Sequence, residues 1–274
     1  MKNEPILQFQ VASDIHITCD KDHIHNRHFS LLLDDVNRVC PQSRGIFVAG
    51  DLTDGGREEQ YGEFFRIYGK SNCRPEIIAV AGNHDIASDY EENIKRFKEN
   101  MKTAASYYSV SIADTGFIFL CGEEAGLRAV LSEKQLTFLE NELNKHPISF
   151  VFIHQGVYNT VAGTLEGQGW DGVICGERLL DALKRHKNVF LFSGHSHWQL
   201  GSEGGVKRLY EGVYAFNTSS VAYLWNDGCD PRGPGIEGSE CLYVNLYKSR
   251  IEVKGRDLVK GEWIDCAAFE TDIL

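Results

Sequence analysis

Short apolar runs alternate with amphipathic stretches along the first third of the chain. Residues 6–13, 45–50 and 76–82 are rich in β-branched and other apolar side chains, and each run is followed directly by Asp or Asn. Such runs predict strands, whereas the spacing of apolar positions over residues 29–40 and 58–70 predicts helices. The alternation indicates βαβ units and a largely parallel sheet that is buried on both faces.

Two further helices are predicted from their first turns. Ser88 with Glu91, and Ser132 with Gln135, have the spacing of a capping box. The first helix should extend to about Lys102, and the second should bury the face that carries leucines 136, 139 and 143.

The remainder of the chain is predicted to be mostly β. The expected elements are a hairpin of residues 107–112 and 117–121, strands at 148–154, 189–193, 213–218, 241–246 and 251–254, and a short helix at 177–186. Gly-rich residues 163–172 and the Gly/Pro-rich segment 227–238 predict loops. Without an internal repeat or a separating linker, residues 1–274 are expected to form one α/β domain with two packed sheets and outer helices.

Composition narrows the classes of partner. The chain has 274 residues, 42% of them hydrophobic, which is enough for one large core, and a net charge of -11. Because no dense Lys/Arg run is present, long nucleic acid is an unlikely partner and a nuclease role is disfavoured. No apolar stretch approaches the roughly 20 residues of a membrane span. The N-terminus lacks the pattern of a secretory signal, so a cytoplasmic location is expected.

Eight cysteines are scattered without a Cys-x-x-Cys spacing. A chain of this length does not need disulfides to stabilise its core, and a reducing compartment would keep thiols free. Buried free thiols are therefore expected.

Five clusters of potential metal ligands follow the predicted strands. They are Asp14-Ile15-His16, Gly50-Asp51-Leu52-Thr53-Asp54, Gly82-Asn83-His84-Asp85, His154 and Gly194-His195-Ser196-His197. Residues two apart on an extended strand share a face, so each Asp-x-His or His-x-His pair should present two ligands in one direction. Imidazole and carboxylate ligands suit Zn²⁺, Mn²⁺ and Fe ions, and a carboxylate can bridge two of them.

Each cluster taken alone has a structural explanation. Asp14-x-His16 is compatible with a surface turn, Asp51 with a helix N-cap, and Asn83 with a turn residue. His154 alone is compatible with a core histidine bonded to a backbone carbonyl. The ordered recurrence of all five clusters at strand ends favours a metal site instead.

In combination these motifs resemble those of the calcineurin-like metallophosphoesterases. The resemblance extends from about residue 6 to residue 220. The resemblance implies a four-layer α/β/β/α sandwich, with two packed mixed β-sheets flanked by helices, and a centre of two metal ions (Mn, Fe or Zn) at the carboxyl ends of the strands. Carried over by position, it implies that one ion binds Asp14, His16, Asp51 and His197, and that the other binds Asp51, Asn83, His154 and His195. Asp51 would bridge the two ions.

The same resemblance implies roles for the neighbouring residues. His84 would stabilise the transition-state charge or protonate the leaving oxygen, with Asp54 as its carboxylate partner. Asp85 is interpreted as a loop or helix cap. The implied reaction is hydrolysis of a phosphate ester by in-line attack of a hydroxide held between the ions. A small phosphodiester is favoured as substrate because no broad basic groove is evident. A phosphomonoesterase or protein phosphatase of the same fold, and a non-catalytic metal-binding scaffold, remain alternatives.

Departures from subgroup patterns narrow the comparison. Asp54 stands where purple acid phosphatases carry a metal-bound Tyr, and His84 stands where the lipid A pathway pyrophosphatases carry Arg. The motifs are most similar to those of bacterial cyclic-nucleotide-phosphodiesterase-type members. Those proteins often have His-Pro after the strand-end histidine, whereas Gln155-Gly156 follows His154 here. A cyclic nucleotide is therefore disfavoured as substrate.

Two other regions are interpreted mainly as structural. The polar stretch 20–28, which contains four charged residues and three histidines, is expected to be a solvated loop rather than a substrate or ion contact. Trp170, Tyr223 and Trp225 could form a lid or line an aromatic-sized pocket, but core and loop packing explains them at least as well.

Overall fold

Two six-stranded mixed sheets pack against each other in the computed structural model, which describes residues 4–72, 74–170, 172–229 and 235–274. The first sheet has the order β12-β11-β10-β1-β2-β3. Its strands are β1 (Leu7–Ala12), β2 (Ile46–Val48), β3 (Ile77–Ala79), β10 (Glu240–Leu246), β11 (Arg250–Asp257) and β12 (Glu262–Asp272). β1, β2 and β3 are parallel, and β10 to β12 continue the sheet in antiparallel register.

The second sheet has the order β4-β5-β6-β7-β9-β8. Its strands are β4 (Tyr108–Ile112), β5 (Thr115–Leu120), β6 (Ile148–Ile153), β7 (Val189–Ser193), β8 (Val206–Tyr210) and β9 (Val213–Asn217). Strands β5, β6, β7 and β9 are parallel to one another. At the two edges, β4 and β8 pair in antiparallel fashion with β5 and β9.

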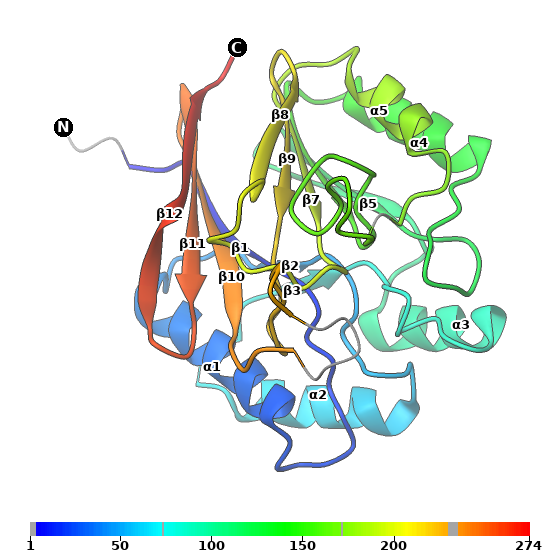
Figure 1. Ribbon diagram of the computed structural model, residues 1–274, viewed down its shortest axis with the longest axis vertical. Coiled ribbons are helices and arrows are strands. Elements are labelled where there is room, and N and C mark those ends of the chain that lie inside the picture. Colours follow the sequence, from blue (N-terminus) through cyan, green and yellow to red (C-terminus); the bar gives the residue numbers. More distant parts are fainter. Residues whose placement is uncertain (1–3, 73, 171, 230–234) are drawn as a thin grey trace.

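Five helices are described, and they complete the outer layers (Figure 1). They are α1 (Ile24–Val39), α2 (Glu58–Lys70), α3 (Tyr90–Met101), α4 (Glu133–Leu143) and α5 (Gly176–Leu183). Apolar residues of α1 and α2 join the core of the first sheet, while those of α4 and α5 cover the outer face of the second. The predicted four-layer α/β/β/α sandwich is confirmed.

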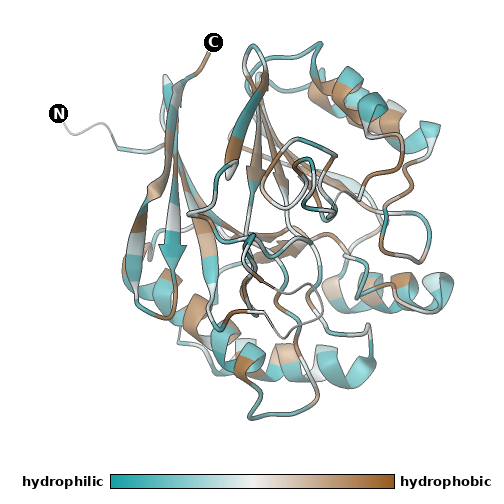
Figure 2. Ribbon diagram, in the orientation of Figure 1, coloured by the Kyte–Doolittle hydropathy of each residue, from teal (hydrophilic) through white to brown (hydrophobic). Residues whose placement is uncertain are grey.

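Phenylalanines fill the space between the sheets. On β6, Phe150 and Phe152 face this inner layer, whereas Val151 and Ile153 face the layer of α4 and α5. The Phe9 ring of the first sheet lies 4.9 Å from that of Phe150, measured between centroids. The central strands of both sheets are accordingly hydrophobic along most of their length, whereas the edge strand β12 is of mixed hydropathy (Figure 2). Burial on both faces explains why the sequence of these strands is continuously apolar.

Two predicted helix starts differ from the structure. Helix α1 begins at Ile24, five residues before the predicted start, because the His23 side chain accepts a hydrogen bond from the backbone nitrogen of His25. Much of the stretch predicted as a solvated loop is therefore helical. Helix α3 is capped by Asp89 rather than Ser88, with the Asp89 carboxylate accepting from the nitrogen of Glu92.

The Ser132 cap is confirmed, but only half of the capping box forms. Its hydroxyl accepts from the Gln135 nitrogen. The Gln135 side chain instead bonds both backbone groups of Cys121. The glutamine therefore joins α4 to the end of β5.

The strands β8 and β12 were not predicted, and both lie at sheet edges. Within the loop predicted at 227–238, residues 230–234 lie outside the described part of the chain. Among the described residues, no helix has the length and apolar character to cross a bilayer.

The seven described cysteines are free, as predicted, and Cys73 lies outside the described residues. Their expected burial is only partly correct. Cys40, Cys121 and Cys241 are buried, whereas Cys19, Cys175 and Cys266 are exposed.

Candidate metal centre

The carboxyl ends of five parallel strands bring the seven predicted metal ligands to one edge of the sandwich. β1 is followed by Asp14 and His16, β2 by Asp51, β3 by Asn83, β6 by His154, and β7 by His195 and His197. All seven side chains are buried. Their location in the fold agrees with the strand-end pattern in the sequence.

The backbone of five of these seven residues is not extended. Asp14, His16, Asp51, His195 and His197 all have left-handed backbone, with φ between 47° and 67°. The expectation that the Asp-x-His and His-x-His pairs share a face of a strand is therefore wrong, because both pairs lie in turns beyond β1 and β7. Left-handed backbone is unfavourable for residues with a Cβ and is common at functional sites.

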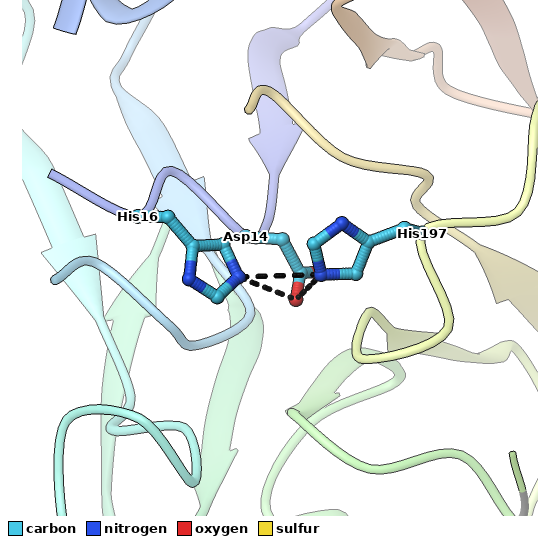
Figure 3. Close-up of side chains that lie close together, drawn as sticks. All are labelled: Asp14, His16 and His197. Carbon is cyan, nitrogen blue, oxygen red and sulfur yellow. Dashed lines mark hydrogen bonds and ion pairs between the residues drawn. The ribbon is translucent and has the colours of Figure 1, made fainter. Parts of the chain in front are cut away.

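A first group of ligand atoms surrounds the Asp14 carboxylate (Figure 3). Its Oδ1 atom lies 3.0 Å from Nε2 of His197 and 3.8 Å from Nε2 of His16. The two Nε2 atoms lie 3.2 Å apart. Three potential ligand atoms from two different sheets therefore converge on one point.

A second group surrounds Asp51. Its Oδ2 atom lies 3.1 Å from Nε2 of His154 and 3.7 Å from Nε2 of His16. The same His154 nitrogen lies 3.1 Å from Oδ1 of Asn83 and 3.8 Å from Oδ1 of Asp14. Each carboxylate thus lies close to histidines of both groups, as ligands of two adjacent ions would.

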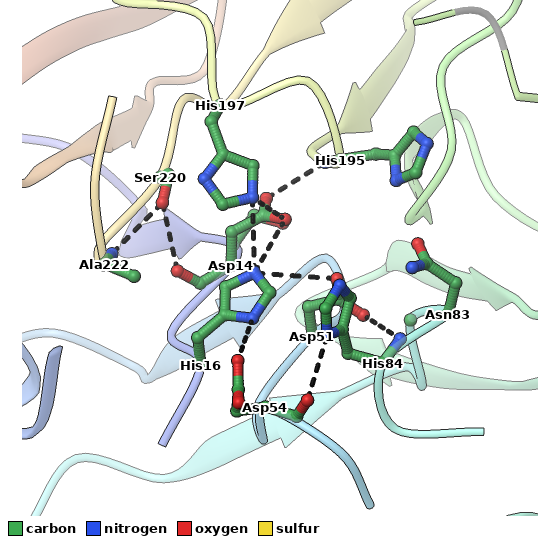
Figure 4. A network of polar contacts seen from close by, with 12 residues as sticks. Asp14, His16, Asp51, Asp54, Asn83, His84, His195, His197, Ser220 and Ala222 are labelled. Atoms are coloured by element: carbon green, nitrogen blue, oxygen red, sulfur yellow. Dashed lines mark hydrogen bonds and ion pairs between the residues drawn. The ribbon is translucent and has the colours of Figure 1, made fainter. Parts of the chain in front are cut away.

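His195 is joined to the centre by its backbone and by ring packing. Its nitrogen donates to Oδ2 of Asp14 at 3.0 Å. Its ring centroid lies 5.1 Å from that of His154. Figure 4 shows the His195 and Asn83 side chains on the same side of the group, away from His16. This placement is compatible with the second predicted ligand set.

The Nδ1 atoms of His154 and His197 have fixed carbonyl partners, which leaves Nε2 to face the carboxylates. Nδ1 of His154 lies 2.9 Å from the carbonyl of Ala49, and Nδ1 of His197 lies 3.1 Å from that of Tyr223. Because a carbonyl only accepts, Nδ1 donates in both contacts. Nδ1 of His16 lies 3.5 Å from the Asp54 carboxylate. Such partners orient the imidazoles that bind metals.

Burial and charge act in opposite directions on these groups. Burial opposes ionisation of Asp14 and Asp51, but the neighbouring His197 and His154 outweigh it and hold both pKa values below the usual range. Burial lowers the pKa of His16, yet the neighbouring carboxylates of Asp14 and Asp54 raise it to about 10. The pKa of His154 rises to about 9 against burial because of Asp51 and Asp14. Positive charge is thus strongly favoured between the two carboxylates.

The donor set fits a pair of metal ions. Oδ1 of Asp14 is fully buried and accepts no hydrogen bond of normal geometry within the described residues, although histidine nitrogens surround it. Carboxylate, imidazole and amide oxygen are ligands for Zn²⁺, Mn²⁺ and Fe, and the described cysteines are absent from the groups that could hold an ion.

The structure changes the predicted contact between His84 and Asp54. Nδ1 of His84 lies 2.9 Å from the backbone carbonyl of Asp54, while the Asp54 carboxylate lies beside His16. The backbone nitrogen of His84 donates to Oδ1 of Asp51 at 2.8 Å. His84 is therefore held at the edge of the centre by the Asp54 carbonyl, which bonds its ring, and by the Asp51 carboxylate, which bonds its backbone nitrogen; the Asp54 carboxylate does not bond the ring.

Asp85 has a more specific contact than the predicted loop or helix cap. Its buried carboxylate accepts hydrogen bonds from the nitrogens of Leu52, Thr53 and Gly82 and from the Thr53 hydroxyl. These bonds join the loop that carries Asp51 to the loop that carries Asn83. This role was not predicted, because three of the four hydrogen bonds come from Leu52 and Thr53, which lie more than 30 residues away in the sequence.

Two glycines leave room for ligands from neighbouring strands. A Cβ at Gly82 would lie 2.1 Å from Oδ1 of Asp51, and one at Gly194 would lie 2.4 Å from Oδ2 of Asp14. Both distances are far below van der Waals contact. Any larger residue would displace a carboxylate of the centre.

Aromatic side chains flank the histidines. The Tyr223 ring lies 4.2 Å from that of His197 and stacks on His25 at 5.5 Å. Trp170 lies 5.5 Å from His195, while Trp225 is buried in a small apolar cluster. Tyr223 and Trp170 thus line the centre, and core packing explains Trp225.

Comparison with known proteins agrees with this geometry. Residues 7–199 match the family model for calcineurin-like phosphoesterases. The chain is 30% identical over 200 residues to a probable glycerophosphodiester phosphodiesterase, GpdQ, of Arcobacter nitrofigilis, covering 68% of this chain and 70% of the relative.

Solved structures share the fold. A purple acid phosphatase from yellow lupin, Lupinus luteus, matches 98% of this chain with a TM-score of 0.69 and 14% identity, and this chain spans 54% of its length. GAP50, the anchor in the inner membrane complex of Plasmodium, matches with a TM-score of 0.66, 13% identity and 89% of its length covered. The chain therefore belongs to the calcineurin-like phosphoesterases and is a metallophosphoesterase-family hydrolase.

Proposed function

We propose that this protein hydrolyses a small phosphodiester to a phosphomonoester and an alcohol, using two divalent metal ions. The observation that carries the proposal is the convergence of two ionised, buried carboxylates and three Nε2 atoms from both sheets. The similarity to a probable glycerophosphodiester phosphodiesterase supports a diester over a monoester.

In this proposal one ion binds Asp14, His16, Asp51 and His197, and the other binds Asp51, Asn83, His154 and His195. When bound, such ions supply an activated water near neutral pH and neutralise charge on the phosphate oxygens. The contacts of Nδ1 with Ala49 and Tyr223 hold two of the imidazoles in the tautomer that presents Nε2.

His84 is the proposed proton donor to the leaving oxygen. Since the Asp54 carbonyl only accepts, Nδ1 of His84 carries a proton, and Nε2 is the nitrogen free to exchange a proton with substrate. Asp54 supports this role through its carbonyl, while its carboxylate lies 3.5 Å from Nδ1 of His16. The backbone bond to Asp51 keeps His84 next to the proposed metal site.

Paired substitutions test these roles. Asn83→Ala removes a proposed ligand and should lower metal content, whereas His84→Ala should keep the metal and lower kcat by about 10²- to 10⁴-fold. Metal content is measured by elemental analysis. Turnover is measured in the presence of Mn²⁺, Zn²⁺ or Fe²⁺ with a glycerophosphodiester, whose alkoxide leaving group needs a proton, and with bis(p-nitrophenyl) phosphate, whose p-nitrophenolate leaves without one; the loss in His84→Ala should be largest with the glycerophosphodiester. His146→Ala, at a half-buried histidine that bonds Ser111 and does not belong to the centre, is the matched control.

Each alternative has a distinct outcome. Faster turnover of p-nitrophenyl phosphate than of the diester would indicate a phosphomonoesterase. Full metal occupancy without turnover of either ester would indicate a metal-binding scaffold. Equal loss of metal in Asn83→Ala and His84→Ala would overturn the role assigned to His84.

A further inference from the structure

A recess of about 260 Å³ opens beside the candidate metal centre. Its lining residues are Asn83, His84, Ala87, Ser88, Gly126 and Leu127. The first two belong to the centre. The other four come from the loops β3–α3 and β5–α4 and are neither proposed metal ligands nor proposed catalytic residues.

Leu127 forms one wall of this recess. Its side chain is 67% exposed, which makes it the most exposed large apolar side chain among the described residues. The loop around it is anchored at its base, where the nitrogen of Glu123 donates to the carbonyl of Val130 at 3.0 Å and that of Ile174 donates to Ala129 at 2.9 Å. The Gln155 amide also contacts the Leu127 carbonyl at 3.5 Å. An exposed leucine is therefore held beside the centre.

The lining suits a small uncharged group. Ala87 and Leu127 present apolar surface, Ser88 provides a hydroxyl, and none of the six lining residues is Lys or Arg. A second phosphate would find no counter-charge among these residues. The volume is slightly below the roughly 300–1,000 Å³ of pockets for drug-sized ligands, which favours a compact alcohol over a nucleoside.

His84 connects the recess to the centre. It lines the recess, its ring lies 4.6 Å from that of His16, and its nitrogen bonds Asp51. A proton donor must be within hydrogen-bond reach of the oxygen it protonates. The group attached to the leaving oxygen must then extend from His84 into the adjoining space.

We infer that this recess receives the leaving alcohol of the phosphodiester, and that Leu127 limits the size of that alcohol. The inference rests on the proposed function. In the reaction, the oxygen of water forms a bond to phosphorus while the bond from phosphorus to the leaving oxygen breaks. The leaving oxygen keeps the electron pair and, where it would otherwise leave as an alkoxide, takes a proton from His84. The proton lost by water passes to solvent, and His84 regains its proton from solvent.

Two substrates with the same leaving group test the inference. Bis(p-nitrophenyl) phosphate and methyl p-nitrophenyl phosphate both release p-nitrophenolate but retain different groups. Leu127→Trp narrows the recess, so kcat/KM should fall about ten-fold or more, and by a similar factor, with both substrates. Metal content should stay at the wild-type level. Leu31→Trp, on the exposed side of α1, is the matched control and should leave kcat/KM unchanged with both substrates.

Other results would overturn the inference. Unchanged kcat/KM with both substrates would show that the recess is not used, and a loss with the bis-aryl substrate alone would place the retained group there. If Leu127→Trp loses metal, Leu127→Ala decides, because loss of apolar contact should still lower kcat/KM with both substrates. A wild-type protein inactive on every diester would refute the proposed function, whereas active wild type with an unaffected Leu127→Trp would refute only the recess.

Discussion

The layer between the sheets and the loops at the ends of the same strands differ in backbone and side chains. Phe9 and Phe150 pack in regular strands with ring centroids 4.9 Å apart. A few residues beyond β1 and β7, Asp14 and His197 are buried polar groups in left-handed backbone. The comparison teaches that the apolar layer stabilises the fold, while the loops hold unfavourable conformations and charges that a metal site requires.

Phe150→Ala tests the apolar layer alone and has the largest expected effect on stability. The ring contacts Phe9, Phe117 and Phe190, so its removal should cost about 3–5 kcal/mol of unfolding free energy. Metal affinity of the folded fraction should be unchanged. Urea denaturation and metal titration measure the two quantities, with Phe150→Leu as the milder variant. Phe65→Ala, at a 40% exposed position, is the control. A parallel loss of metal affinity would show that the regions are not separable.

Asp85→Asn tests the loops alone. The amide cannot accept all four hydrogen bonds that the carboxylate receives, so the loops bearing Asp51 and Asn83 should separate slightly. Metal affinity should fall by about 10- to 100-fold, as for other residues that position ligands. Competition with a chelator measures the affinity. Asp114→Asn, in the exposed β4–β5 turn, should leave it unchanged. Wild-type affinity in Asp85→Asn would mean that the loops hold their positions without this carboxylate.

The pH dependence of the metal-free protein gives the smallest effect. His16 and His154 have pKa values raised to about 10 and about 9, against roughly 6.5 when unfolded. Raised values mean that the folded protein binds more protons, so this stabilisation is complete below about pH 6.5 and is lost as pH rises toward 10. Urea midpoints with a chelator should decrease from pH 7 to pH 10. The decrease should be shallower in His16→Gln; an identical slope would contradict the assignment.

Much of the fold was predictable because most strands are buried on both faces. Apolar runs followed by Asp or Asn identified β1, β2 and β3 with errors of one to three residues at their ends. β8 and β12 were missed because edge strands carry polar residues toward solvent, and β12 is exposed or half-buried along its length.

The candidate site was predictable in its residue types but not in its geometry. Strand-end position alone brought Asp14, Asp51 and His154 together. The left-handed backbone and the carbonyl partners of the imidazoles depend on contacts between distant segments, such as Tyr223 with His197. Such contacts leave no local pattern in a single sequence. The same applies to Asp85, whose carboxylate accepts hydrogen bonds from Leu52 and Thr53 of another loop.

The carbonyl groups that orient His154 and His197 belong to the main chain. No single substitution deletes the oxygen of residue 49 or 223, so the direction of these two imidazoles is protected against most point mutations nearby. The Tyr223 side chain can therefore be exchanged while its carbonyl continues to orient His197. The side chain that packs on His197 and the orientation of His197 can therefore be changed separately. This makes residue 223 a practical starting point for redesigning substrate selectivity.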